Sequence, residues 1–209
     1  MAVITGGRVE KYMAGLLPER DEVLQGMEVL AAELRIPIIG PVVGRFLYQL
    51  LRVTKARRVF EMGSAIGYST LWAARAVGPG GSVYYTDGDA ANAKRAEGYL
   101  ERAGLRDRVR IEVGDALELL EQTSGEFDVI FCDVDKEQYP AVFAKAVPRV
   151  RRGGLLLADN VLWQGKVTEP AGDEPTRGIQ EFNRLVYSSK ELFSVMIPVR
   201  DGFMVCEKL

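Results

Sequence analysis

From residue 58 onward, short apolar runs alternate with longer segments in which apolar residues recur every three or four positions. The short runs predict buried strands, and the three-to-four spacing predicts amphipathic helices. The predicted strands cover residues 59–62, 82–86, 109–113, 129–132, 155–158, 193–198 and 202–207. The predicted helices cover residues 69–77, 90–103, 116–122, 141–150 and 176–189. This alternation predicts an α/β fold in which helices cover a seven-stranded, mostly parallel sheet.

The last two predicted strands are joined by only a few residues around Arg200 and Gly202. A link this short is too short for a parallel crossover, so the two strands should form an antiparallel hairpin. We therefore expect the final strand to run against the others.

The first 57 residues follow a different pattern, with helices predicted at 20–34 and 44–51. Pro37 and Pro41 should break any helix in segment 36–44, which separates these two predicted helices. Apolar residues at helical spacing in the first helix should form an exposed face that a homodimer would cover; they are Val23, Leu24, Met27, Leu30 and Leu34. We expect residues 1–57 to pack on a core of residues 58–209 as one domain, with a mobile surface loop at 165–178.

The composition excludes several classes of function. A chain of 209 residues suits one domain, and its net charge of −2 gives no basic field for nucleic acid. It has no uncharged stretch long enough for a membrane span, no signal-peptide pattern and only two cysteines, so we expect a cytoplasmic protein. The chain has no histidine, which excludes His-based triads and leaves acid-base chemistry to Lys, Tyr, Asp or Glu.

A glycine turn follows the first strand of the predicted sheet. Gly63 and Gly67 allow the backbone to pass close to a ligand, although an ordinary tight turn is the alternative. A dinucleotide site needs glycine at the first, third and sixth positions of the turn, and the last two hold Ala65 and Tyr68. NAD is therefore disfavoured. Glu61 would repel phosphate and would instead suit a cationic amino group.

Acidic residues follow the second and third strands. Asp87 ends the second strand, where a carboxylate can accept both hydroxyls of a ribose. Asp115 and Ala116 follow the third strand and reach the same edge of the sheet, where they could contact an adenine. For Asp87 and Asp115 alike, capping of the next helix is the alternative.

The fourth and fifth strands are followed by two carboxylates and an amide. Asp133 and Asp135 follow the fourth strand, and Asp159 and Asn160 follow the fifth. Such oxygen donors at neighbouring strand ends suit Mg²⁺ or a similar cation. Lys136 lies beside them and could take a proton if its pKa were lowered. The alternatives are solvated loop charges, with Asp135 as a helix cap.

In order and spacing, these residues resemble the S-adenosylmethionine-dependent, divalent-cation-dependent O-methyltransferases of the catechol and caffeoyl-CoA type, in their short bacterial branch. The Asp-x-Asp-Lys and Asp-Asn-x-x-Trp pairs make the match specific. The matching segments are 16–20, 59–70, 87, 114–116, 131–136, 157–167, 177–183 and 198–202. The resemblance implies a Rossmann-like three-layer sandwich, a homodimer and methyl transfer to a phenolic acceptor of the catechol or hydroxycinnamoyl type.

The resemblance also assigns roles to single residues. It places around S-adenosylmethionine the residues Glu61, Gly63, Ser64, Gly67, Ser69, Asp87, Gly88, Asp115, Ala116, Asp133 and Asp135. It makes Asp133, Asp159 and Asn160 the ligands of a divalent cation, with Mg²⁺ expected. It assigns catalysis to Lys136, as base, and Asp133, and it places Trp163 and Gln164 at the substrate.

Two positions depart from the family pattern. Ile39 stands where plant members have a hydroxyl residue near the cofactor, and Val195 aligns with a substrate-facing acidic residue of the mammalian catechol enzyme. The second departure indicates that the acceptor is held differently here. Two other functions stay open at this stage: a non-catalytic S-adenosylmethionine-binding protein, and another nucleoside-cofactor enzyme on the same fold.

Overall fold

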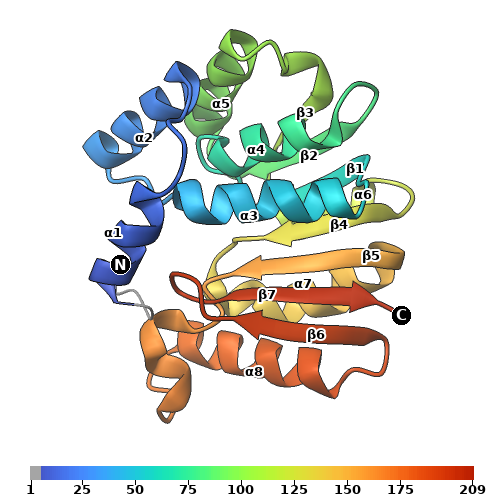
Figure 1. The fold of residues 1–209 in the computed structure, drawn as a ribbon. Helices are drawn as coiled ribbons and strands as arrows, with labels where there is room; N and C mark the ends of the chain where they lie inside the picture. Colours follow the sequence, from blue (N-terminus) through green and yellow to red (C-terminus); the bar gives the residue numbers. More distant parts are fainter. Residues whose placement is uncertain (1–5) are drawn as a thin grey trace.

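The computed structural model describes residues 6–209 as a twisted sheet with helices on both faces (Figure 1). Within this range the sheet has seven strands in the order β3-β2-β1-β4-β5-β7-β6. The strands are β1 (Arg58–Met62), β2 (Ser82–Asp87), β3 (Val109–Val113), β4 (Phe127–Cys132), β5 (Val150–Asp159), β6 (Leu192–Ile197) and β7 (Phe203–Lys208). The helices are α1 (Gly7–Gly15), α2 (Glu22–Leu34), α3 (Gly40–Val53), α4 (Tyr68–Val77), α5 (Ala90–Arg102), α6 (Ala116–Gln122), α7 (Tyr139–Ala146) and α8 (Glu174–Ser188).

β7 is the only strand of this sheet that runs against the others. It pairs antiparallel with β5 on one side and with β6 on the other, whereas β3, β2, β1, β4 and β5 pair in parallel. The predicted fold class and the predicted final hairpin are therefore confirmed. Because the parallel strands share one direction, their carboxyl ends lie along a single edge of the sheet.

Alternate strand residues pack on opposite faces of the sheet. Val59 points into a core formed with α2, α3, α4 and α5, while the next residue, Phe60, points into a core formed with α6, α7 and α8. This period-two alternation explains why the strands are apolar on both sides and why helices cover both faces. Among residues 6–209, each helix is too short or too polar to cross a membrane.

The apolar face of α2 packs within the same chain, which corrects the expectation that it is exposed. Leu24 and Met27 are buried, and Val23 and Leu30 are half-buried against the same core. Only Leu34 of the five predicted residues is largely exposed, at 48%. This helix therefore has no large apolar face left for a second subunit.

The sequence pattern predicted that Pro41 breaks a helix, and this prediction is wrong. α3 begins at Gly40, four residues before the predicted start, and places this proline in its first turn. The first backbone N–H groups of a helix have no partner inside the helix, so proline is tolerated there. α1 was not predicted at all, although Val9, Tyr12 and Met13 lie at helical spacing in it; none of its residues is buried.

Segment 165–178 is more regular than the predicted mobile loop. A 3-10 turn covers Trp163–Thr168, and α8 begins at Glu174 behind Asp173, whose carboxylate accepts a hydrogen bond from Thr176 N at 2.7 Å. The predicted helix 141–150 is also too long. α7 ends at Ala146, and β5 begins at Val150 after a 3-10 turn.

Candidate active site

A cavity of about 540 Å³ opens along the edge where the parallel strands end. The loops after β1 to β5 line it, together with the loop between β6 and β7. Twelve of the predicted site residues line this cavity: Gly63, Asp87, Gly88, Asp115, Ala116, Asp133, Asp135, Lys136, Asp159, Asn160, Trp163 and Gln164. Four others, Glu61, Ser64, Gly67 and Ser69, do not line it. The topology thus brings most of the predicted residues to one place.

The two glycines of the turn are required by packing within the protein. Gly63 has φ 83°, and a Cβ added there would lie 2.4 Å from the carbonyl oxygen of Asp133. Gly67 has φ 82°, and its Cβ would lie 2.8 Å from Cβ of Ala96 on α5. Both positions therefore exclude a side chain, whether or not a ligand is present. Only Gly63 also faces the cavity.

Glu61 lies beneath the glycine turn and is buried. Thr70 Oγ1 donates a hydrogen bond to Oε2 of this carboxylate, while Oε1 has no hydrogen-bond partner among the described residues. Burial raises the pKa of Glu61 to about 7, although the nearby hydroxyls of Ser69, Thr70 and Ser64 oppose this rise. The carboxylate of Glu61 thus contacts the start of α4 through Oε2, and its Oε1 remains an unused hydrogen-bond acceptor.

Asp87 fixes the other side of the glycine turn. Its Oδ2 accepts a hydrogen bond from Ala65 N at 2.8 Å, and its Oδ1 accepts hydrogen bonds from Asp89 N at 2.9 Å and from Asn92 Nδ2 at 3.3 Å. Tyr85 OH also donates to Ala65 O, at 2.6 Å. A carboxylate has about four lone-pair sites, so Asp87 keeps acceptor capacity that faces the cavity.

The helix-cap alternative is confirmed for Asp115 and fails for Asp135. Asp115 Oδ1 accepts hydrogen bonds from Leu117 N and Glu118 N, at 2.9 and 3.0 Å, at the start of α6. Asp135 precedes a 3-10 turn, yet its side chain makes no cap hydrogen bond. Both residues line the cavity, so Asp135 has its carboxylate available there.

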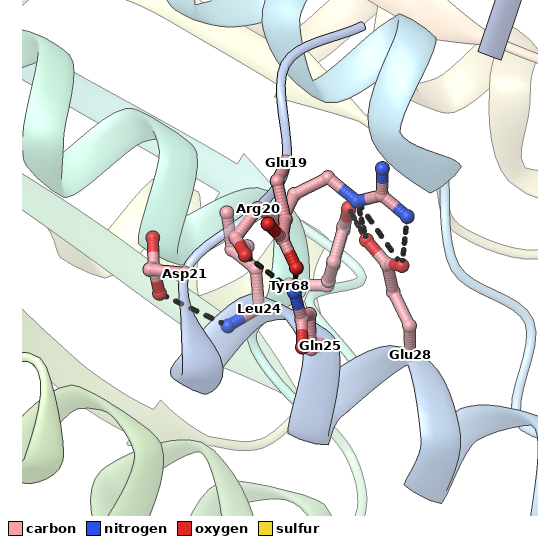
Figure 2. Close-up of polar contacts among 7 residues, drawn as sticks. All are labelled: Glu19, Arg20, Asp21, Leu24, Gln25, Glu28 and Tyr68. Carbon is pink, nitrogen blue, oxygen red and sulfur yellow. Dashed lines mark hydrogen bonds and ion pairs between the residues drawn. The ribbon is translucent and has the colours of Figure 1, made fainter. Parts of the chain in front are cut away.

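The start of α4 is also anchored from outside the cavity, as Figure 2 shows. Tyr68, the first residue of α4, donates to Glu28 Oε1 at 2.7 Å. Arg20 donates to the same carboxylate through Nε and Nη2, at 2.9 and 2.8 Å. Since Glu28 belongs to α2, this network ties the N-terminal helices to the end of the glycine turn.

Asp159 and Asn160 end β5 and lie beside Asp133. Asp159 is buried, and its Oδ1 has no hydrogen-bond partner among the described residues. Burial and the negative charge of Asp133 raise the pKa of Asp159 to about 7, while the positive charge of Arg200 opposes the rise. Two neighbouring carboxylates with an unpaired buried oxygen form an environment that fits a cation.

Lys136 is paired with the first of these carboxylates. Its Nζ donates to Asp133 Oδ1 at 2.8 Å and to Val134 O at 2.9 Å. Burial lowers the pKa of Lys136, but the charge of Asp133 and the hydrogen bond to it outweigh burial, so the pKa is raised. In this arrangement the side chain is an ammonium.

Sequence reasoning missed three residues of this site. Tyr139 OH donates to Asp159 O at 2.7 Å, Asp201 Oδ1 accepts from Gln164 N at 2.5 Å, and Arg200 lines the cavity. Asp201 and Arg200 lie in segment 198–202, whose match to the family pattern was a signal that they reach the site. Tyr139 follows Lys136 by three residues, and no pattern distinguished it from a core residue.

The two departures from the family pattern lie outside the cavity. Ile39 is buried in the core beneath α3, and its neighbours Pro37 and Ile38 line the cavity instead. Val195 lies on β6 and is 49% exposed, away from the cavity lining. The absence of an acid at this position therefore has no direct effect on the cavity wall.

A family model described as O-methyltransferase matches residues 20–209. This chain belongs to the O-methyltransferase family. The family and the enzyme class predicted from the sequence are thus confirmed, and the match covers every strand and every predicted site residue of this O-methyltransferase.

Named relatives agree with this assignment. A catechol O-methyltransferase from Niastella koreensis is 36% identical over 185 residues, covering 85% of this chain and 84% of that protein. A caffeoyl-CoA O-methyltransferase from Eucalyptus globulus is 31% identical over 179 residues, covering 79% and 72%. The crystal structure of the O-methyltransferase from Bacillus cereus in complex with SAH has a TM-score of 0.89 and 31% identity to this chain, covering 97% of both chains.

Proposed function

We propose that this protein transfers the methyl group of S-adenosylmethionine to one hydroxyl of a catechol-like or hydroxycinnamoyl-type acceptor, assisted by a divalent cation. One observation carries the proposal: a single cavity joins the glycine turn and Asp87 to the cluster of Asp133, Lys136 and Asp159. The names of the relatives, catechol and caffeoyl-CoA O-methyltransferases, support the acceptor class.

The glycine-turn half of the cavity suits the cofactor. Asp87 offers its remaining acceptor capacity to a ribose hydroxyl, and Ala116 presents a small apolar surface suited to an adenine. Glu61 lies behind the turn and does not line the cavity, so it would favour a cationic amino group there through its charge and not by direct contact. When bound, S-adenosylmethionine supplies a methyl group on a positively charged sulfur. Two neighbouring carboxylates, Asp133 and Asp135, line the same wall and favour such a charge.

Asp133, Asp159 and Asn160 would hold the divalent cation, with Mg²⁺ expected. Within residues 6–209 no three Cys, Asp or Glu side chains gather as a metal site, so the amide of Asn160 has to serve as the third ligand. The unpaired buried Oδ1 of Asp159 and the raised pKa of this carboxyl support the assignment. When bound, the cation supplies positive charge that lowers the pKa of an acceptor hydroxyl.

Lys136 is the proposed proton acceptor. Its Nζ lies on the cavity wall, 2.8 Å from Asp133, within reach of a hydroxyl held at the same carboxylate. Because the pKa of Lys136 is raised in this arrangement, the ammonium must first release a proton to solvent, which loss of its contact with Asp133 would favour, before the neutral amine can accept the hydroxyl proton. Tyr139 and Trp163 flank Nζ at 5.2 and 6.0 Å from their ring centroids and limit access of water.

The test is a methyl-transfer assay on catechol with S-adenosylmethionine, with and without added Mg²⁺. Wild type should turn over with Mg²⁺ and stop when the metal is chelated. Replacement of Asp159 and Asn160 by Ala should abolish Mg²⁺-stimulated turnover while calorimetry still shows binding of S-adenosylhomocysteine. Full activity in chelator, or in the double variant, would contradict the cation-assisted mechanism.

A homodimer and a cytoplasmic location also belong to the proposal. The edge strand β6 presents Phe193, which is 70% exposed, and Val195, with Tyr187 of α8 exposed nearby. An open edge with apolar side chains is suited to a second copy of the chain. A reducing cytoplasm is supported by Cys132 and Cys206, both buried and both without a disulfide.

A further inference from the structure

Arg200 lies in the loop between β6 and β7 and faces the acceptor side of the cavity. Its side chain is only 13% exposed. Lys136 and Arg200 are the only cationic side chains among the described residues that line this cavity. Lys136 is already paired with Asp133. Of these two side chains, Arg200 is therefore the one whose N–H donors are available to a ligand.

The guanidinium of Arg200 forms no hydrogen bond to any residue in the range 6–209. Its nearest carboxylates are Glu10 on α1, 3.6 Å from Nε, and Asp159, 4.0 Å from Nη1, both beyond hydrogen-bonding distance. Nη1 is fully buried without a partner. A guanidinium has five N–H donors, and within residues 6–209 none of those of Arg200 makes a hydrogen bond, so the donors that face the cavity are open to an acceptor group from a ligand.

The backbone at Arg200 does not favour an arginine. Its φ is 51°, in the left-handed region where glycine is the least strained residue. The loop is held in place by its neighbours: Leu162 N donates to Asp201 O at 2.9 Å, and Gly202 packs directly against Leu162. A glycine would adopt this left-handed backbone conformation with less strain. We therefore attribute the arginine at this position to a role of its side chain.

We propose that Arg200 is a specificity-determining residue that binds a carboxylate on the phenolic acceptor. The planar guanidinium fork matches a carboxylate with two parallel hydrogen bonds. Asp159, 4.0 Å from Nη1, would hold the cation in the proposed function and would then not compete for Arg200. The inference rests on the proposed function and narrows its acceptor class to aromatic diols that carry an acidic group.

The kinetic test compares 2,3- and 3,4-dihydroxybenzoate with the neutral 4-methylcatechol. Wild type should favour at least one of the acids, and Arg200→Gln should lose about tenfold or more in kcat/KM for it, mainly through KM. The same variant should stay within about threefold of wild type on the neutral diol. Arg184→Gln, which removes an exposed arginine of α8, is the matched control and should leave both acceptors unchanged.

Arg200→Gly separates a binding role from a structural one. This variant relieves the left-handed backbone, so its Tm should equal or exceed that of wild type while its preference for the acid is lost. A fall in Tm, or an equal loss on acid and neutral diol, would show that Arg200 serves mainly to tie the loop to α1 through Glu10. Either result overturns the inference.

A binding experiment keeps this inference distinct from the proposed function. Benzoate and benzamide have no hydroxyl to methylate, and calorimetry can compare their binding in the presence of S-adenosylhomocysteine. Wild type should bind benzoate more tightly than benzamide, and Arg200→Gln should bind them equally. Failure to methylate any diol would contradict the proposed function alone, whereas equal binding of the two probes by wild type would contradict the role of Arg200.

Discussion

The pKa of the Glu61 carboxyl depends on its burial in the folded protein, which the local sequence does not reveal. The sequence predicted a residue that could hold an amino group, and the structure adds burial, which raises its pKa to about 7. Nothing in the residue pattern around the glycine turn distinguishes a buried from an exposed glutamate. Only the packing of Ser69 and Thr70 above it does so.

The raised pKa of Glu61 makes the stability of the cofactor-free protein depend on pH. The folded state holds a proton that the unfolded state loses above its ordinary pKa of 4.5, so this stabilisation is complete below pH 4.5 and is lost as the pH rises to about 7. The difference amounts to about 3 kcal/mol. Glu61→Gln should remove it. Urea unfolding from pH 4.5 to 8 should give a flatter profile for this variant than for wild type.

The control for this experiment is Glu126→Gln, which changes an exposed glutamate of the same chain. Its pH profile should follow that of wild type. Since other carboxyls also titrate in this range, the measured quantity is the difference between the two variants. Equal slopes in Glu61→Gln and Glu126→Gln would contradict the assignment of the pH dependence to Glu61.

We predict that Lys136 contributes most to kcat near neutral pH. Lys136→Ala should lower kcat by about 10² to 10⁴ at pH 7, because Lys136 is the proposed proton acceptor. The loss should shrink toward pH 10, where the acceptor hydroxyl ionises without help. Lys145→Ala, on α7 and paired with Glu121, is the control. A pH-rate profile parallel to that of wild type would remove the role of base and leave that of orienting the acceptor.

Elements that bury an apolar stripe or run were predicted from the sequence, and α1, which buries none of its residues, was not. Most strands are buried on both faces and appear as short apolar runs, whereas most helices bury one face and leave a period of three to four residues. α1 buries none of its residues, although Val9, Tyr12 and Met13 lie at helical spacing, and the first turn of α3 contains a proline; neither start was predicted. Segment 165–178 was predicted as a mobile loop from its glycines and charges, although Gly178 is there to let α8 pack on the backbone of Lys136.

The contact between the glycine turn and the end of β4 gives a prediction at the level of elements. Gly63→Ala should destabilise the protein by about 2 to 4 kcal/mol, because its Cβ would overlap the carbonyl of Asp133 and its φ is positive. Gly88→Ala is the matched control, since Gly88 also lines the cavity but has free space around its Cβ position. Chemical denaturation measures both; equal stabilities would contradict the packing argument.

For the whole molecule, parallel topology explains why the site could be largely predicted. Polar residues at the ends of parallel strands converge on one edge, so Asp87, Asp133 and Asp159 were expected to meet, and the structure brings them together. Arg200 was not expected, because its loop reaches the cavity through an antiparallel hairpin. Its role depends on burial and on unpaired donors, and neither leaves a mark in the sequence.

Assembly is predicted to depend on the edge of the sheet. Light scattering at micromolar concentration should give the mass of a dimer, and Phe193→Lys should shift the mass toward a monomer, because a charge at the centre of an apolar edge opposes pairing. Leu34→Lys, on the partly exposed end of α2, should leave the dimer intact. A monomeric wild type would refute the homodimer, and an intact Phe193→Lys dimer would place the interface elsewhere.

β7 is the last strand of the sheet to leave the ribosome, although it lies between β5 and β6. Until it has been made, β6 has no neighbour in the sheet and β5 remains an open edge. The strands next to the proposed cofactor site, β1 to β3, are therefore synthesised first, and β7, which follows the loop that contains Arg200, is synthesised last. Chains interrupted before residue 203 would expose an unpaired apolar strand, a known route to aggregation.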